Sequence, residues 1–218
     1  MSGRKWGESF LKSGLPLEHV TLVTLRSEGF LCYPNVEYAR QEENSKKGSW
    51  FEIDMEATWC HKNKDTRLSL LVECKYHDQS RFWFFLPCER ERWYFNDRVF
   101  NFGPLQTLTR PLSQSALSLA PLSCRGMVIS RAGTKQDNAV HAAVQQLVNG
   151  FVPLTLSKMF RFFLVPSKPS SPPCCTSLVP MIVTNAQIYR LRPNLTDLSM
   201  IRDASSPADV GDLLPWTW

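Results

Sequence analysis

Apolar and polar positions near the start of the chain predict a helix followed by a strand. After Pro16, apolar residues recur at the spacing of one helix face, and the pattern ends at Gly29. We therefore expect a helix from about Leu17 to Glu28. The residues from Phe30 to Glu42 predict a strand that is broken at Pro34, because proline cannot donate a ladder hydrogen bond.

Two apolar segments, residues 49–61 and 67–77, predict an antiparallel hairpin in the middle of a sheet. The charged turn KNKDT joins them. Residues 81–88 predict a further strand, and residues 125–130 predict a short one. Between these two strands, residues 101–123 are rich in proline, serine and leucine, and we expect them to be irregular.

The second half of the chain predicts one helix and two late strands. From Gln136 to Gly150, apolar residues fall on one helix face, and the pattern ends at a glycine, a common C-terminal signal. Residues 160–166 and 178–191 predict strands on either side of the low-complexity loop SKPSSPPCCTS. The order helix, strands, helix, strands favours an α/β fold with a mixed central β-sheet flanked by helices.

The composition is that of a globular chain large enough for one domain. Of its 218 residues, 43% are hydrophobic and 21% are charged. The net charge of +5 leans towards a polyanionic partner without the excess of a histone-like binder. The seven cysteines form no C-x2-C pair, which favours reduced thiols. We find no apolar signal core and no run of about 18 apolar residues, so we expect a soluble, cytoplasmic protein with no membrane partner.

The second strand of the predicted hairpin places two charged side chains on one of its faces. Because successive residues of a strand point to opposite faces, Leu71, Glu73 and Lys75 share one face. Val72 and Cys74 point into the other layer. A glutamate and a lysine therefore stand side by side at the end of an otherwise apolar strand.

The first strand of the hairpin adds further acids to the same region. Alternation predicts one acidic face and one apolar face for this strand. The acidic face would hold Glu52, Asp54 and Glu56, and the apolar face would hold Ile53, Met55 and Ala57. Carboxylates that lie so close together repel one another unless a cation neutralises them.

A divalent cation would supply that neutralisation. Magnesium takes hard oxygen ligands, usually one or two carboxylates together with waters and substrate phosphate. Asp54, Glu73 and the backbone carbonyl of Cys74 could provide such ligands. Lys75 would then orient the attacking water or stabilise the negative charge of the transition state. This is the chemistry of phosphodiester hydrolysis.

Asp54, followed on the next strand by Glu73-x-Lys75, resembles the catalytic signature of the PD-(D/E)XK nuclease superfamily, although Ile53 stands where the nominal motif has proline. The resemblance implies a restriction-endonuclease-like fold and a Mg²⁺-dependent endonuclease, with Mn²⁺ as a substitute, that hydrolyses DNA. A role in bacterial DNA processing or antiviral defence would fit it. We expect residues 15–195 to form the nuclease domain, between an N-terminal extension over residues 1–14 and a C-terminal tail over residues 196–218.

The resemblance also implies roles for residues outside the hairpin. In that superfamily a glutamate on the first helix often assists the metal, and a glutamine on a later helix contacts the substrate or the lysine. The matching residues here are Glu18 and Gln146, with Gln145 as the less favoured neighbour. Each also has an equally good structural explanation. Glu18 could be a first-turn acid that the helix dipole favours, and Gln145 and Gln146 could be ordinary polar residues on the surface of a helix. One copy would cut one strand, so duplex cleavage would need a homodimer or a partner protein.

Three other readings stay open. The chain could be a catalytically silent member of the same fold that binds nucleic acid or serves in an assembly. It could be an interaction protein whose acidic hairpin is only a solvated face. Cys60-His61 and Cys74-x2-His77 suggest zinc, but the spacing is not that of a zinc ribbon, and Cys74 should face away from Glu73.

Overall fold

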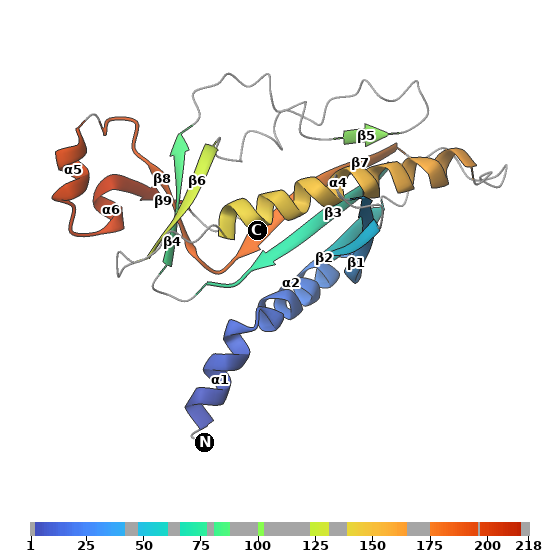
Figure 1. Cartoon of the computed structure of the whole chain (residues 1–218), viewed down its shortest axis with the longest axis horizontal. Helices are drawn as coiled ribbons and strands as arrows, with labels where there is room; N and C mark the ends of the chain where they lie inside the picture. The colour runs from blue at the N-terminus through green and yellow to red at the C-terminus, as the bar shows by residue number, and fades with distance from the viewer. Residues whose placement is uncertain are drawn as a thin grey trace.

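A computed structural model of the chain contains two β-sheets (Figure 1). Helices flank these sheets, so the fold class is mixed α/β, as the order of elements predicts. The residues that the structure describes are 3–41, 48–60, 66–77, 81–87, 100–102, 123–130, 139–164, 175–195 and 197–214.

The larger sheet has the strand order β1-β2-β3-β7-β5. Its strands are β1 (Leu31–Gln41), β2 (Gly48–Cys60), β3 (Thr66–Lys75), β5 (Phe100–Phe102) and β7 (Cys175–Thr184). β2 and β3 pair antiparallel in the interior of the sheet, which confirms the predicted hairpin. β3 and β7 pair in parallel over their whole length. The sheet is therefore mixed, as predicted.

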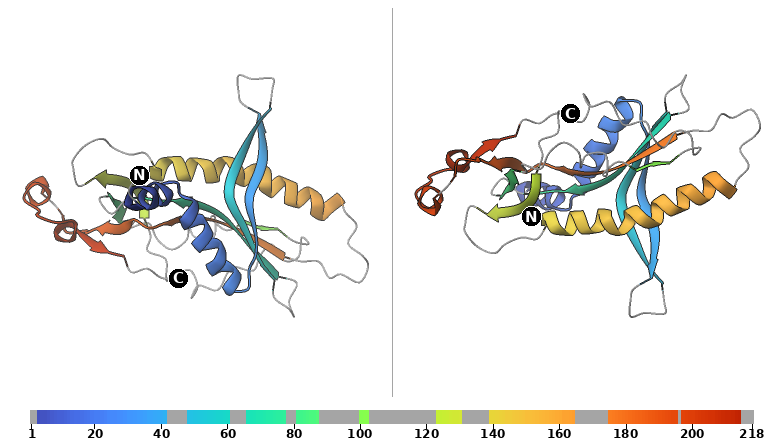
Figure 2. Two further views of the ribbon diagram at one scale, coloured as in Figure 1. Left: turned by 90° about the horizontal axis from the view of Figure 1, so that it is seen from below. Right: turned by 90° about the horizontal axis from the view of Figure 1, so that it is seen from above.

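Two helices lie on opposite sides of the larger sheet (Figures 1 and 2). α2 (Leu15–Ser27) packs Leu17 and Leu22 onto one face, and it agrees closely with the predicted first helix. α4 (Ala139–Leu164) packs Leu147 and Leu154 onto the other face. Each helix buries one apolar stripe, and this burial is what holds it on the sheet.

The smaller sheet has the order β6-β4-β8-β9. Its strands are β4 (Arg81–Pro87), β6 (Ser123–Ser130), β8 (Gln187–Leu191) and β9 (Gly211–Leu213). Two short helices, α5 (Leu198–Arg202) and α6 (Pro207–Val210), precede β9. Because β9 pairs with β8, the expected C-terminal tail contributes one strand to this sheet.

The expectation of a single sheet is wrong, and so is the single strand predicted over residues 178–191. This segment divides at Asn185 and Ala186 into β7 of the larger sheet and β8 of the smaller one. Asn185 Oδ1 accepts the N–H of His77 at 2.7 Å, and Asn185 Nδ2 donates to the carbonyl of His77 at 2.7 Å. These two bonds tie the end of β7 to the segment after β3 at the point where both leave the larger sheet.

The predicted end of the second helix at Gly150 is also wrong. α4 continues through Gly150 and Pro153 to Leu164, so residues 160–164 are helical and not the predicted strand. A Cβ added at Gly150 would lie 2.5 Å from Ile53 Cδ1 and 2.9 Å from Tyr38 Cε1. Gly150 therefore serves the close approach of α4 to the sheet and does not end the helix.

β1 runs through Pro34 without the predicted break. It lies at the edge of the sheet, where the missing N–H of a proline can face outward. The next residue, Asn35, has a φ of 54°, in the left-handed region that non-glycine residues rarely adopt. The backbone irregularity of β1 therefore lies at Asn35, one residue after the break that the sequence predicts at Pro34.

The structure describes only the ends of the segment that we expect to be irregular. Residues 101–102 belong to β5 and residue 123 to β6, while residues 103–122 lie outside the described residues. The expected N-terminal extension contains a helix, α1 (Gly3–Lys12). None of the helices in the described part of the chain is long and apolar enough to cross a membrane.

Candidate active site

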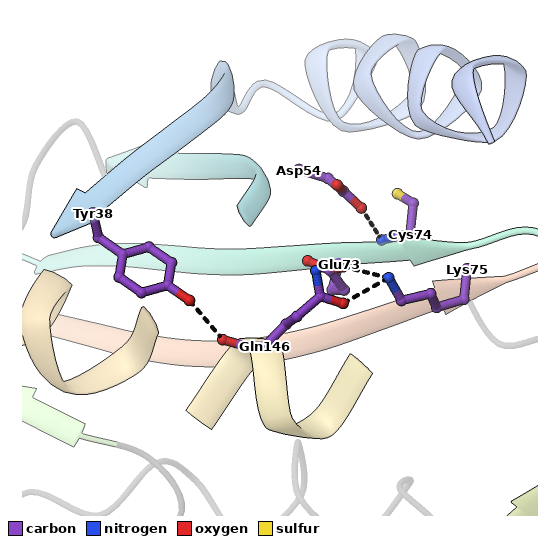
Figure 3. Close-up of polar contacts among 6 residues, drawn as sticks. All are labelled: Tyr38, Asp54, Glu73, Cys74, Lys75 and Gln146. Atoms are coloured by element: carbon purple, nitrogen blue, oxygen red, sulfur yellow. Dashed lines mark hydrogen bonds and ion pairs between the residues drawn. The ribbon is translucent and has the colours of Figure 1, made fainter. Parts of the chain in front are cut away.

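Asp54 lies where β2 separates from β3. The ladder between these strands ends at the pair Met55–Val72, whereas β3 stays paired with β7 as far as Lys75. Beyond the end of the ladder, the backbone N–H of Cys74 donates to Asp54 Oδ2 at 2.6 Å (Figure 3). This bond replaces a strand-to-strand hydrogen bond, and it fixes the Asp54 carboxylate at the end of β3.

The side chains of β3 alternate as predicted. Leu71 packs in the apolar cluster under α4, whereas Val72 and Cys74 pack in the cluster under α2. Glu73 and Lys75 therefore share the α4 side of the strand.

The alternation of β2 reverses at Asp54. Ile53 packs under α4, whereas Met55 and Ala57 pack under α2, so the predicted single apolar face of this strand is wrong. Asn35 of β1, with its left-handed φ, occupies the facing position. A left-handed residue interrupts the regular pleat of β1, and β1 exchanges its faces at the same position, since Cys32 packs under α2 and Val36 under α4.

The acidic residues of β2 consequently do not share one face. Glu56 forms an ion pair with Lys158 of α4. Glu52 lies close enough to Glu18 of α2 that its negative charge raises the pKa of Glu18. The predicted common face of these acids with Asp54 is therefore wrong. No sequence pattern pointed to Lys158, because the predicted helix ended before it.

Glu73, Lys75 and Gln146 form one hydrogen-bonded group between β3 and α4 (Figure 3). Lys75 Nζ donates to Glu73 Oε1 at 2.6 Å and to Gln146 Oε1 at 2.8 Å. Glu73 is fully buried, with 0% of its surface exposed. Within the described residues, Glu73 Oε2 has no hydrogen-bond partner. One oxygen of a buried carboxylate is thus left for a further ligand.

Gln146 itself is held by the packing of α4. The Tyr38 hydroxyl of β1 donates to the backbone carbonyl of Gln146 at 3.4 Å (Figure 3). The neighbouring Gln145 is exposed and points away from the sheet. Sequence reasoning missed Tyr38, because a tyrosine in an apolar strand cannot be told from an ordinary core residue by its spacing.

Glu18 lies in the first turn of α2, close to Asp54. Burial raises the pKa of Glu18, and the negative charges of Asp54 and Glu52 raise it further, while Lys75 lowers it. The structure therefore places Glu18 at the edge of the group, on the α2 side of the sheet.

Burial also raises the pKa of the two central acids. For Asp54, the effect of burial outweighs the hydrogen bond from the N–H of Cys74 and the positive charge of Lys75, both of which lower the pKa. For Glu73, the effect of burial outweighs the hydrogen bond from Lys75, and the negative charge of Asp54 raises the pKa further. The backbone N–H of Asp54 lowers the pKa of Glu73 as well. Two acids that resist ionisation at one site are typical of functional sites.

The group offers hard oxygen ligands but not a complete cage. In the part of the chain that the structure describes, no three His, Cys, Asp or Glu side chains lie close enough together to hold a metal ion. Magnesium does not need three, because it binds through one or two carboxylates and keeps several waters. Asp54, the unpartnered oxygen of Glu73 and the backbone carbonyl of Cys74 fit that requirement.

The Cys74 thiol does not fit a zinc site. It packs in the apolar cluster under α2, and burial raises its pKa to about 12, so the thiol stays protonated. Its polar neighbour is Thr21 Oγ1, at 3.8 Å. Cys60 is exposed at the end of β2, and His61 lies outside the described residues.

Comparisons with known proteins identify no relative of this chain. No protein-family model, no curated protein and no solved structure matches it. Its function must therefore be inferred from the geometry and chemistry of the site itself.

Proposed function

We propose that this chain is a Mg²⁺-dependent endonuclease that hydrolyses phosphodiester bonds in DNA and has the restriction-endonuclease-like fold of the PD-(D/E)XK superfamily. The observation that carries the proposal is the meeting of Asp54, Glu73 and Lys75 at one end of β3, under Gln146 of α4. Buried charges are costly, and apolar residues of similar volume would pack at least as well. A chemical role explains why this position holds charged groups.

Lys75 would act on the attacking water. Its ammonium is held by Glu73 Oε1 and Gln146 Oε1, which limits its motion. From this position it can orient a water beside a bound phosphate, or stabilise the negative charge that develops as the new P–O bond forms. The water loses a proton to solvent as its oxygen bonds to phosphorus, the bond between phosphorus and the leaving alcohol breaks, and the alcohol oxygen takes up a proton from solvent.

Asp54 and Glu73 would hold the cation together with the backbone carbonyl of Cys74, and Glu18 would assist from the α2 side. A bound Mg²⁺ would polarise the phosphate and activate a water for attack. The raised pKa of both central acids supports this assignment, because a divalent ion restores the stabilisation that their carboxylates lose on burial. Mn²⁺ would substitute, since it accepts the same oxygen ligands.

The burial of Glu73 argues against an interaction protein whose acidic hairpin is only a solvated face. Glu73 exposes none of its side chain, and its ion pair with Lys75 lies under α4. A solvated face would leave such charges in water, where they cost little. A catalytically silent binding module of the same fold is the second candidate, and an activity assay separates it from the first.

Cleavage assays with the full chain test the proposal. The protein is incubated with duplex DNA, single-stranded DNA and RNA in Mg²⁺, Mn²⁺ or EDTA, beside the variants Asp54→Ala and Lys75→Ala. We expect DNA cleavage that requires metal and disappears in both variants. Asp197→Ala is the matched control, because Asp197 is an exposed acid at the start of α5, outside the site.

Two results would contradict the proposed nuclease. Nucleic-acid binding by all four proteins with no cleavage would support the silent binding module. Cleavage that survives Asp54→Ala would place the chemistry at another site. Cutting of both strands of a duplex would further indicate a homodimer or a partner protein, since one site cuts one strand at a time.

A further inference from the structure

α1 carries an exposed aromatic pair. Trp6 and Phe10 lie one helical turn apart, and their rings stack with centroids 5.5 Å apart and planes within 9° of parallel. Trp6 is 71% exposed and Phe10 is 44% exposed. The pair is therefore not part of the core, and one ring face of the tryptophan is open to a ligand.

α1 projects from the body of the protein, and its C-terminal end meets α2 (Figure 1). Among the described elements, α2 is the one on which α1 packs most extensively. The two helices meet at Gly14, whose φ of 84° makes the turn and whose carbonyl accepts the N–H of Glu18 at 3.2 Å. Because Glu18 lies beside Asp54, the turn adjoins the site. At about 1.5 Å per helical residue, Trp6 lies about 12 Å from this turn.

The sequence of α1 is basic. It contains Arg4, Lys5 and Lys12 against a single acid, Glu8. Lys12 is exposed at the end of the helix that is nearest to the site. Flat aromatic rings together with basic side chains are the combination that proteins use to bind single-stranded nucleic acid.

We propose that α1 is an arm that binds single-stranded nucleic acid and presents it to the active site. An unpaired base stacks on the open face of Trp6, and Lys12 contacts a phosphate between that base and the site. With a reach of about 12 Å, the arm would hold the strand a few nucleotides from the cleaved bond. The presentation step rests on the proposed nuclease function, whereas the binding step does not.

The shape of α1 favours a nucleic acid over a lipid surface. A helix that lies in a membrane interface needs a continuous apolar face. In α1 that face consists of Trp6, Phe10 and Leu11, and Gly7, which has no side chain, falls between Phe10 and Leu11 on the helix surface. The apolar area is therefore small, but it is large enough for one or two bases.

Fluorescence anisotropy with a labelled single-stranded DNA of about 16 nucleotides tests the arm. EDTA is present, so that cleavage does not interfere. We expect Trp6→Ala to weaken binding roughly 5- to 150-fold, the range of one base–aromatic stack. Trp50→Ala is the matched control, because Trp50 is 73% exposed but lies on β2. Lys12→Gln should reduce the slope of log affinity against log salt by about 0.7.

Several outcomes would overturn the arm. These are equal affinity of the wild type and Trp6→Ala, an equal loss in Trp6→Ala and Trp50→Ala, or an equal loss for duplex and single strand. Binding to anionic phospholipid vesicles through Trp6, without binding to the oligonucleotide, would assign α1 to a membrane surface instead. Since Trp6 is mostly exposed, its replacement removes little packing, and circular dichroism verifies the fold.

The arm and the nuclease can fail separately. If Trp6→Ala abolishes binding but the wild type cuts nothing, the arm stands and the nuclease is rejected. If the wild type and Trp6→Ala cut single-stranded DNA with the same KM and kcat, the nuclease stands and the arm is rejected.

Discussion

Lys75 Nζ of β3 donates a hydrogen bond of 2.8 Å to Gln146 Oε1 of α4, although the two residues lie 71 positions apart in the chain. The same ammonium donates to Glu73 Oε1. Lys75 therefore connects the strand that carries the acids to the helix that covers them. The position of its charge depends on how closely α4 approaches the sheet.

Replacement of Gln146 should loosen Lys75 and slow the proposed reaction. A hydrogen bond to a charged group contributes about 1.5–3 kcal/mol, so Gln146→Ala should lower the single-turnover rate roughly 10- to 150-fold. Gln145→Ala is the control, because Gln145 is exposed on the same turn of helix. Equal rates in the two variants would mean that the contact between Gln146 and Lys75 has no catalytic role.

Gly150→Ala should destabilise the protein, although alanine is the better helix former. The gain in helix propensity is about 1 kcal/mol, but an added Cβ would meet Ile53 Cδ1 at 2.5 Å and Tyr38 Cε1 at 2.9 Å. Overpacking of a core typically costs about 1–3 kcal/mol, so the net change in the free energy of unfolding should be a loss. Urea denaturation measures it.

A double-mutant cycle with Ile53→Val shows whether that loss comes from the contact itself. Valine lacks Cδ1, the atom closest to the new methyl group, so Gly150→Ala should cost less in the Ile53→Val background. Gly7→Ala is the control, because a Cβ at Gly7 meets nothing within 4 Å. Additive effects of Gly150→Ala and Ile53→Val would exclude the contact as the cause.

The part of the site that sequence could predict is the part set by local periodicity. Glu73 and Lys75 are two residues apart on one strand, so strand alternation alone brings them to the same face. Glu18 could be placed near them only through the family resemblance, since no local pattern relates α2 to β3. The same holds for Gln146, whose partner lies on a distant strand.

The features that sequence could not predict depend on contacts between distant segments. The exchange of faces in β2 occurs opposite the left-handed Asn35 of another strand. The role of Gly150 is set by Ile53 and Tyr38, so a glycine that looked like a helix end lies inside a helix. The division of residues 178–191 between two sheets likewise occurs where the Asn185 amide exchanges two hydrogen bonds with the backbone of a distant residue, His77.

Asp54→Asn should make the protein more stable at neutral pH but not at acidic pH. Burial raises the Asp54 pKa above its ordinary value of 3.8, so between these two values the folded protein holds a proton that the unfolded chain releases. Stability therefore falls as pH rises through this window, and the full cost is present above it. Asparagine keeps an oxygen that accepts the N–H of Cys74 but carries no charge. Urea denaturation at a series of pH values measures the difference.

Asp197→Asn should change the stability of the folded protein in the opposite direction to Asp54→Asn. Hydrogen bonds from Ser199 lower the pKa of this exposed acid, so its charge stabilises the folded protein above the ordinary pKa, and this is lost as pH falls through the lowered value. The variant should be less stable than the wild type at neutral pH, with a difference that shrinks in acid. The same trend in both variants would contradict the assignment of the Asp54 effect to burial.

Mg²⁺ should stabilise the folded protein through Asp54. An ion that binds only the folded state adds RT ln(1 + [L]/Kd), which is about 1.4 kcal/mol at roughly tenfold above the dissociation constant. We expect thermal unfolding in Mg²⁺ to occur at a higher temperature than in EDTA for the wild type and for Asp197→Asn, but not for Asp54→Asn. An equal rise in unfolding temperature in the wild type and both variants would indicate non-specific screening of surface charge. A gain that is lost in Asp54→Asn alone would locate the ion at the end of β3 without reference to any activity, because unfolding reports binding even where no substrate is cut.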